Sequence, residues 1–185
     1  MGTSPQKTVS KLRSRSNTAK FTASYGCAVI QRKTLIHEIS RGHSMTHLKK
    51  MTLFWQGNYR FMVKNEKGII AQFDSPTENG GEETALSPME NVLASLAACS
   101  SYDVISILRK KRQRISRFSA EITGERRNEL PKVFTNIQIK YLIYGTQISK
   151  AAVESAINIS EENCTVGQML KNVVKVTSSF EILNE

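Results

Sequence analysis

The chain has 185 residues, of which 39% are apolar and 23% are charged. That composition supports one folded domain, or one domain with a tail, and it excludes a chain that is disordered throughout. No run of about 18 consecutive apolar residues occurs, so we expect no membrane-spanning segment and no membrane partner.

The net charge of +10 is distributed unevenly along the chain. Residues 1–50 contain ten Lys or Arg and one acid, Glu38, which gives a balance of +9. Residues 51–185 contain the other sixteen basic and fifteen acidic residues, which gives +1. We therefore divide the chain into a basic, Ser/Thr-rich leader over 1–50, expected to be disordered, and a nearly neutral domain over 51–185.

The leader has several interpretations that the sequence leaves open. Its Ser, Thr, Lys and Arg content resembles that of an organellar transit sequence. It could equally be a disordered basic extension, or the result of an upstream start codon, with Met45 or Met51 as the natural beginning. Cytoplasmic localisation is the default expectation, and import into an organelle through the leader stays open.

Nucleic-acid binding has weak support in the sequence. The run Arg109-Lys110-Lys111-Arg112-Gln113-Arg114 and the leader are both basic. A basic run at a helix end is usually a solvated terminus that interacts with the helix dipole. We therefore expect no specific nucleic-acid partner.

The positions of histidine and cysteine restrict the chemistry of the domain. All three histidines, His37, His43 and His47, lie in the leader, so Ser-His-Asp catalysis, Cys-His catalysis and His-ligated zinc are excluded from the domain. Its two cysteines, Cys99 and Cys164, are too few for a four-thiolate site. No glycine-rich phosphate-binding motif occurs. We expect no metal and no cofactor, and the odd cysteine count, which includes Cys27, indicates a reducing compartment.

The element pattern predicts an α+β fold with antiparallel pairing. Strands are expected around a Gly57-Asn58 turn, and a long helix is expected to begin where Ser87, Pro88 and Glu90 form a capping box. In chain order the expected elements are strands in 51–64 and 69–73, a loop at 74–86, a helix over 88–113 whose length allows one break, strands at 115–126 and 132–144, a helix at 149–162, a connection at 163–170 and a strand at 173–183.

Cys99 lies at the border of the apolar face of the long helix, and Cys164 follows the second helix. Border placement fits either a packed small residue or a reactive thiol with partial access to solvent. The two cysteines are 65 residues apart in the sequence, so whether their sulfurs meet depends on the fold. Without histidine, a thiolate would depend on backbone dipoles or on a cation such as Arg60, Arg126 or Arg127.

Three separated segments resemble the OsmC/Ohr family. They are Ser87-Pro88-Met89-Glu90-Asn91-Val92-Leu93-Ala94-Ser95-Leu96-Ala97-Ala98-Cys99, then Gly124-Glu125-Arg126 with Pro131-Lys132-Val133-Phe134-Thr135-Asn136-Ile137, and finally Glu162-Asn163-Cys164-Thr165-Val166 with Met169-Leu170. The resemblance covers about residues 51–183. It implies an OsmC-like fold, with antiparallel sheets around a long central helix, in an intertwined homodimer.

The resemblance also implies thiol-dependent reduction of organic hydroperoxides in oxidative stress defence. Cys99 is similar in position to the peroxidatic cysteine and Cys164 to the resolving cysteine, with an external dithiol as reductant. Arg60 is the expected match to a family arginine. Glu90 departs by one position from the family acid, because Met89 directly follows the proline, and on a continuous helix it would act only from a partner subunit.

An alternative is a non-enzymatic OsmC-like dimer that binds a small apolar ligand at its interface. In that case the cysteines would be vestigial, and peroxide would be turned over no faster than by a free thiol.

Overall fold

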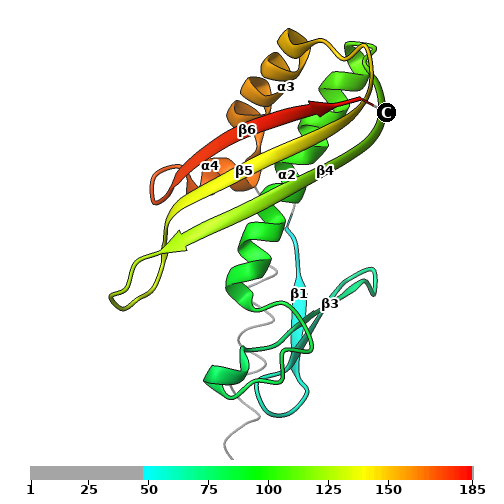
Figure 1. Cartoon of the computed structure of the whole chain (residues 1–185). Helices are drawn as coiled ribbons and strands as arrows, with labels where there is room; N and C mark the ends of the chain where they lie inside the picture. The colour runs from blue at the N-terminus through cyan, green and yellow to red at the C-terminus, as the bar shows by residue number, and fades with distance from the viewer. Residues whose placement is uncertain (1–47, 185) are drawn as a thin grey trace, which may run out of the picture. The chain divides into compact units, whose positions relative to one another are not determined.

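The computed structural model describes residues 48–184 (Figure 1). The leader expected over 1–50, with Cys27 and the three histidines, lies almost entirely outside the described residues. In chain order the elements are β1 (Met51–Trp55), β2 (Phe61–Asn65), β3 (Ile70–Phe73), the 3-10 helix η1 (Thr77–Asn79), α2 (Pro88–Lys110), β4 (Arg114–Arg126), β5 (Phe134–Thr146), α3 (Lys150–Asn163), α4 (Thr165–Leu170) and β6 (Lys175–Leu183). The α+β class is confirmed.

The first sheet is a three-stranded antiparallel meander in the order β1-β2-β3. Its first turn lies at Gly57-Asn58 as predicted, and both residues have positive φ, which glycine and asparagine tolerate best. The indole N–H of Trp55 closes this turn by donating to the carbonyl oxygen of Asn58 at 2.8 Å. The turn therefore fixes the register of β1 against β2.

Helix α2 begins at the predicted capping box. The Ser87 hydroxyl accepts from the Glu90 N–H at 3.3 Å, and the Glu90 carboxylate accepts from the Ser87 N–H at 2.7 Å. The helix then runs unbroken for 23 residues and ends with Arg109 and Lys110 in its last turn. By length and composition alone it could cross a membrane, which we did not expect from the sequence. One such helix is weak evidence, since core helices of soluble proteins have the same length and composition.

The second sheet has the order β4-β5-β6. β4 and β5 form a long antiparallel hairpin, as predicted. β6 pairs parallel to β5, so the expectation of antiparallel pairing throughout is wrong here. The physical reason is the return path, because α3 and α4 carry the chain back along the sheet before β6 begins.

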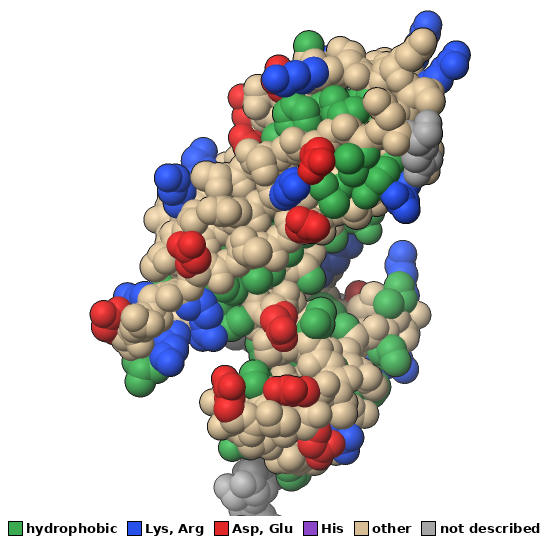
Figure 2. Space-filling model, viewed as in Figure 1, with side chains coloured by type: hydrophobic (Ala, Val, Ile, Leu, Met, Phe, Trp, Pro, Cys, Tyr) green, Lys and Arg blue, Asp and Glu red, His purple; other side chains and the backbone are tan. Residues whose placement is uncertain are grey.

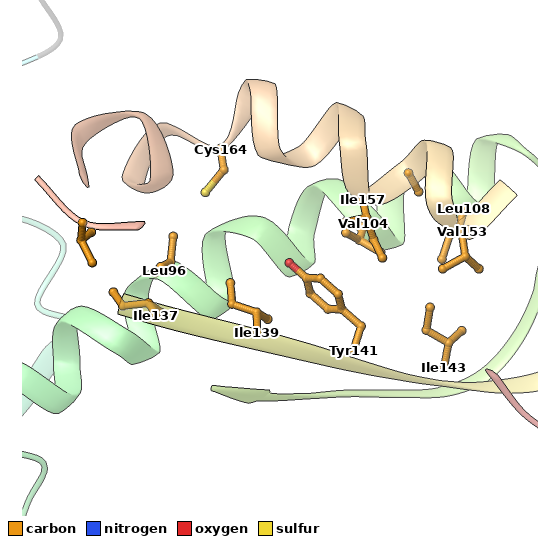
Figure 3. Close-up of a cluster of buried hydrophobic side chains, with 12 residues drawn as sticks. Leu96, Val104, Leu108, Ile137, Ile139, Tyr141, Ile143, Val153, Ile157 and Cys164 are labelled. Atoms are coloured by element: carbon orange, nitrogen blue, oxygen red, sulfur yellow. The ribbon is translucent and has the colours of Figure 1, made fainter. Parts of the chain in front are cut away.

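The core lies between the second sheet and the three helices α2, α3 and α4 (Figure 3). α2 contributes a stripe at i, i+4 spacing, and every second residue of β5 points into the same core. The fully buried members are Leu96, Val104 and Leu108 from α2, Ile137, Ile139, Tyr141 and Ile143 from β5, and Val153, Ala156 and Ile157 from α3.

α2 and β4 approach each other closely at Gly124. A Cβ at this position would lie 2.5 Å from a ring carbon of Phe134 and 2.9 Å from Cδ2 of Leu93. Only glycine fits in this space without a shift of its neighbours. Gly124 therefore sets how closely α2, and Cys99 on it, can approach the sheet.

Candidate functional site

The fold brings Cys99 and Cys164 together. Cys99 lies in the fourth turn of α2 and is partly buried, whereas Cys164 lies at the junction of α3 and α4 and is 2% exposed. Figure 3 shows the Cys164 sulfur pointing from that junction into the core. The Cys164 thiol is hydrogen-bonded to Cys99, so the two residues, 65 positions apart in the sequence, are direct neighbours.

The two thiols differ in accessibility, and the environment of Cys164 disfavours its ionisation. Burial raises the pKa of the Cys164 thiol above its ordinary value of 9.0, and the hydrogen bond to Cys99 raises that pKa further. The backbone N–H groups of Gly167 and Val166 oppose the rise without cancelling it. Cys164 is therefore the more buried thiol, with a raised pKa, and Cys99 is the more accessible sulfur.

A short helix follows Cys164 directly, where the sequence predicted only a connection. Cys164 is the N-cap residue of α4, and its Sγ accepts a hydrogen bond from the Gly167 N–H at 3.3 Å. A Cβ on Gly167 would lie 3.5 Å from this sulfur, in ordinary van der Waals contact. The sulfur is thus held by the helix on one side and by Cys99 on the other.

A buried hydroxyl cluster lies beside the cysteines, formed by Tyr141, Ser100 and Ser178. The Tyr141 hydroxyl hydrogen-bonds to both serine side chains, and burial raises the pKa of Tyr141 above 10.0. Ser160 extends the cluster, because its hydroxyl donates to the Ser100 carbonyl oxygen at 2.9 Å. In Figure 3 the Tyr141 ring rises from β5 with its hydroxyl directed toward the helices.

This cluster was not predicted from the sequence. Strict alternation along β5 places Tyr141 on the same face as Ile137 and Ile139. That alternation is the signal that could have found Tyr141. Nothing in the sequence indicated that Ser100 and Ser178 would lie beside it.

Arg60 lies just before β2 and forms an ion pair with Glu82, with Nη1 at 3.3 Å from Oε2. Its Nε is buried without a hydrogen-bond partner. Among residues 48–184 the structure gives Arg60 no contact with either cysteine, so this candidate cation does not lie beside Cys99 within one chain. Glu82, in the loop before α2, was not singled out from the sequence.

Glu90 is occupied by the capping box at the start of α2. Its hydrogen bonds with Ser87 lower the pKa of its carboxyl below the ordinary value of 4.5. Since α2 is continuous, Glu90 lies more than two turns from Cys99 along the same helix. The structure therefore does not bring Glu90 and Cys99 together within one chain.

The other two arginines considered from the sequence bind the backbone of the β4–β5 hairpin. Arg126 donates to the Lys132 carbonyl oxygen at 2.7 Å, and Arg127 donates to that of Pro131. These hydrogen bonds stabilise the turn between β4 and β5, and neither arginine contacts the cysteines. In the described part of the chain, no group of three or more His, Cys, Asp or Glu side chains is arranged to hold a metal ion.

Comparison with known proteins identifies similar sequences and similar folds. Residues 80–179 match the family of OsmC-like proteins. The chain is 41% identical to Protein YhfA of Escherichia coli (strain K12) over 130 residues, which cover 70% of this chain and 94% of that protein.

Two solved structures illustrate the shared fold. A hypothetical protein from Aquifex aeolicus VF5 has a TM-score of 0.66 at 32% identity, over 76% of this chain and 99% of that one. An organic hydroperoxide resistance protein, OsmC, from Legionella pneumophila has a TM-score of 0.59 at 17% identity, over 75% and 99%. At the latter identity the likeness concerns the fold alone.

Proposed function

Because the chain belongs to the OsmC-like family, we propose that it reduces organic hydroperoxides through a dithiol–disulfide cycle of Cys99 and Cys164. The observation that carries the proposal is the hydrogen-bonding contact between these two thiols. Two cysteines in contact inside a core that has no imidazole suit a cycle that needs no metal and no organic cofactor.

The unequal burial of the two thiols supports the roles that we propose for them. The Cys99 thiolate attacks the distal oxygen of the hydroperoxide, the O–O bond breaks, and the alkoxide leaves as the alcohol after taking a proton. Cys99 is then a sulfenic acid. The Cys164 thiol gives up its proton as its sulfur attacks the Cys99 sulfur, a disulfide forms, and the hydroxyl group leaves with that proton as water. The peroxide gains the two electrons that the thiols lose, and an external dithiol restores both thiols.

We further propose that the active unit is a homodimer. The strands of the first sheet make extensive contacts only with one another. They expose large apolar side chains that Figure 2 shows at the surface of this part of the molecule. The exposed side chains include Met51 at 60%, Leu53 at 59%, Trp55 at 70% and Ile70 at 55%.

A three-stranded sheet needs an apolar face covered by another layer in order to be stable. A second copy of this chain can supply that layer, because α2 also keeps much of its surface uncovered in a single chain. Tyr102 on α2, for example, is 75% exposed.

Dimerisation would also give Arg60 a catalytic position. Its buried Nε has no partner within one chain, and the guanidinium could face Cys99 of the second copy and stabilise its thiolate. Glu90 could act only across the same interface, because α2 is continuous from Pro88 to Lys110. For Glu90, capping α2 is by itself a sufficient role.

The test is thiol titration of the full chain before and after one equivalent of cumene hydroperoxide. We expect two thiols to be lost in the wild type and a disulfide joining the Cys99 and Cys164 peptides. Cys164→Ser should stop at a sulfenic acid that dimedone traps on Cys99. Cys27→Ser is the matched control, and it should behave as the wild type does.

Two outcomes would overturn the proposal. One is the persistence of both free thiols after peroxide treatment, and the other is wild-type turnover by Cys99→Ser. Persistent thiols, together with a small apolar molecule retained in a native mass spectrum, would favour the alternative of a ligand-binding dimer.

A further inference from the structure

The end of the domain at which α2 finishes carries a cluster of exposed basic side chains. Figure 2 shows Lys and Arg side chains projecting there, at the top of the view. The Ser149 N–H donates to the side-chain oxygen of Gln113 at 2.8 Å, which holds the start of α3 against the turn that follows α2. The cluster, which we name the basic end, consists of Arg109, Lys110, Lys111, Arg112, Arg114 and Lys150.

The rest of the domain does not neutralise the basic end. Within residues 48–184, the one ion pair that any of its six side chains forms joins Lys150 to Glu154 at 3.8 Å. The acids gather elsewhere, because residues 74–90 contain one Asp, four Glu and no Lys or Arg. α2 begins within that acidic segment and finishes at the basic end, so about 35 Å of helix lies between the two groups. The small net charge of the domain therefore hides a strong local positive charge.

Helix stabilisation does not account for the whole basic end. The helix dipole favours cations in the last turn of a helix, and this covers Arg109 and Lys110. Arg114 lies beyond the end of α2, as the first residue of β4. Lys150 is the first residue of α3, where the helix dipole disfavours a cation. These two cations therefore need another explanation.

Arg112 occupies a position that stability alone would give to glycine. The Arg112 N–H donates to the Arg109 carbonyl oxygen at 2.9 Å, and the Gln113 N–H donates to that of Leu108 at 3.0 Å. These bonds form a Schellman motif, in which Arg112 has a φ of 55°, in the left-handed region that glycine favours. An arginine here keeps a positive charge at a cost in backbone energy, and such costs are typical of functional positions.

We infer that the basic end binds the phosphate backbone of double-stranded DNA without reading its sequence. Clustered Lys and Arg side chains bind DNA by releasing the counterions of its phosphates, and this contribution is independent of the bases. Such binding agrees with the expectation that the chain has no specific nucleic-acid partner. It is also separate from peroxide reduction, because Arg109 lies more than two turns of α2 beyond Cys99.

The surroundings of the basic end favour duplex DNA over other anionic partners. Proteins that lie on an anionic membrane insert apolar side chains, and proteins that bind single strands stack the bases on aromatic rings. Neither feature is present at the basic end, since no large apolar or aromatic side chain in residues 103–129 or 145–158 is exposed. The basic end therefore offers charge and hydrogen-bond donors only, which suit the outside of a duplex.

Fluorescence anisotropy of a labelled short DNA duplex with the full chain tests the inference. The leader over 1–50 is also basic, so the comparison uses two triple variants of equal net charge. We expect the variant at the basic end to bind about tenfold or more weakly at about 0.1 M salt, with the slope of log K against log salt reduced by about two to three. The control should match the wild type, and equal affinities of the two variants would overturn the inference. The variants are Arg112→Gln/Arg114→Gln/Lys150→Gln at the basic end and Lys67→Gln/Lys132→Gln/Lys171→Gln at exposed positions elsewhere.

Arg112→Gly separates binding from stability. Glycine suits the left-handed conformation of this position, so the variant should unfold at a higher urea concentration than the wild type. It should nevertheless bind the duplex several-fold more weakly, with the salt slope reduced by about one, and turn over peroxide at the wild-type rate. Unchanged DNA binding by this variant would overturn the inference, because Arg112 would then have a structural role alone.

The identity of the partner is tested with further probes. Two duplexes of unrelated sequence should bind with equal affinity at the same salt concentration, because the phosphates alone are contacted. A single strand of the same length, an RNA duplex of the same sequence and phosphatidylserine-rich vesicles should each bind more weakly. Tighter binding to any of these three, lost in the triple variant at the basic end, would overturn the assignment to double-stranded DNA.

Discussion

Arg60 binds Glu82 at 3.3 Å, while Glu90, the acid that the sequence suggested for the active site, caps the helix that carries Cys99. The side chains of Arg60 and Glu82 are 41% and 45% exposed, so their ion pair contributes little to stability. We expect Glu82 to orient the guanidinium toward the second copy that we propose covers this sheet.

That relationship gives a prediction on turnover. Arg60→Gln removes the charge proposed to stabilise the Cys99 thiolate, and we expect kcat/KM for cumene hydroperoxide to fall by about tenfold or more, or ~1.4 kcal/mol in transition-state stabilisation. Glu82→Gln should also lower kcat/KM, but by less, because the arginine remains and is no longer oriented by the carboxylate. Glu78→Gln, in the same loop, is the control. Unchanged kcat/KM in Arg60→Gln would remove Arg60 from the mechanism.

The capping box allows the two roles of Glu90 to be separated. Ser87→Ala should lower the free energy of unfolding by about 1 kcal/mol, the usual cost of losing a helix cap. Glu90→Gln should keep both stability and turnover, because glutamine can also complete a capping box. Urea unfolding and peroxidase assays on the same samples check both expectations. A Glu90→Gln protein that is stable but inactive would show that the carboxylate takes part in catalysis.

The exposed first sheet gives a prediction on assembly. Leu53→Glu places a charge on the apolar face that we propose a second copy covers, and it should shift the protein from dimer to monomer at micromolar concentration. Gln72→Glu introduces the same charge at an exposed polar position on β3, and it should leave the dimer intact. Sedimentation velocity measures both. A wild-type protein that sediments as a monomer would contradict the proposed dimer.

Asp74 gives a prediction on acid stability. This carboxylate is 1% exposed, and its pKa is lowered from 3.8 to about 2, mainly by the Thr84 N–H and then by the Thr84 hydroxyl and the N–H groups of Ser75 and Glu82. A lowered pKa in the folded state means that the stabilisation is fully present above pH 3.8 and is lost as the pH falls toward about 2.

We therefore expect Asp74→Asn to unfold at lower urea concentration than the wild type at about pH 6, where Asp74 is ionised. The difference between the two midpoints should shrink as the pH is lowered through the range of Asp74 ionisation. Asp103→Asn, on α2, serves as a comparison at a second aspartate. A difference that stays constant down to the lowest pH would show that the hydrogen bonds matter and the charge does not.

The local elements of the fold were largely predictable from the sequence. Ser87, Pro88 and Glu90 mark the start of α2, and Gly57-Asn58 marks the first hairpin, because capping and positive-φ turns depend on a few adjacent residues. The parallel pairing of β6 was not predictable in this way. It depends on the path of α3 and α4 through space, which local patterns do not encode.

In the candidate site, too, the individual residues could be predicted from the sequence but their contacts could not. The two cysteines could be singled out from the resemblance, but their contact required the helix junction that places Cys164 against α2. The partner of Arg60 could not be inferred, because Glu82 is one of four acids within residues 74–83 and only the folded loop selects it. The Tyr141 cluster joins α2, β5 and β6, and no single segment predicts it.

The sulfur of Cys164 has a second consequence as the cap of α4. In the thiol form it accepts the Gly167 N–H. In a disulfide the same atom would be bonded to Cys99, and its orientation would follow the new bond. Each oxidation would then change the hydrogen bond in the first turn of this six-residue helix. The amide resonance of Gly167 should therefore report the redox state of the cysteine pair, which is otherwise spectroscopically silent.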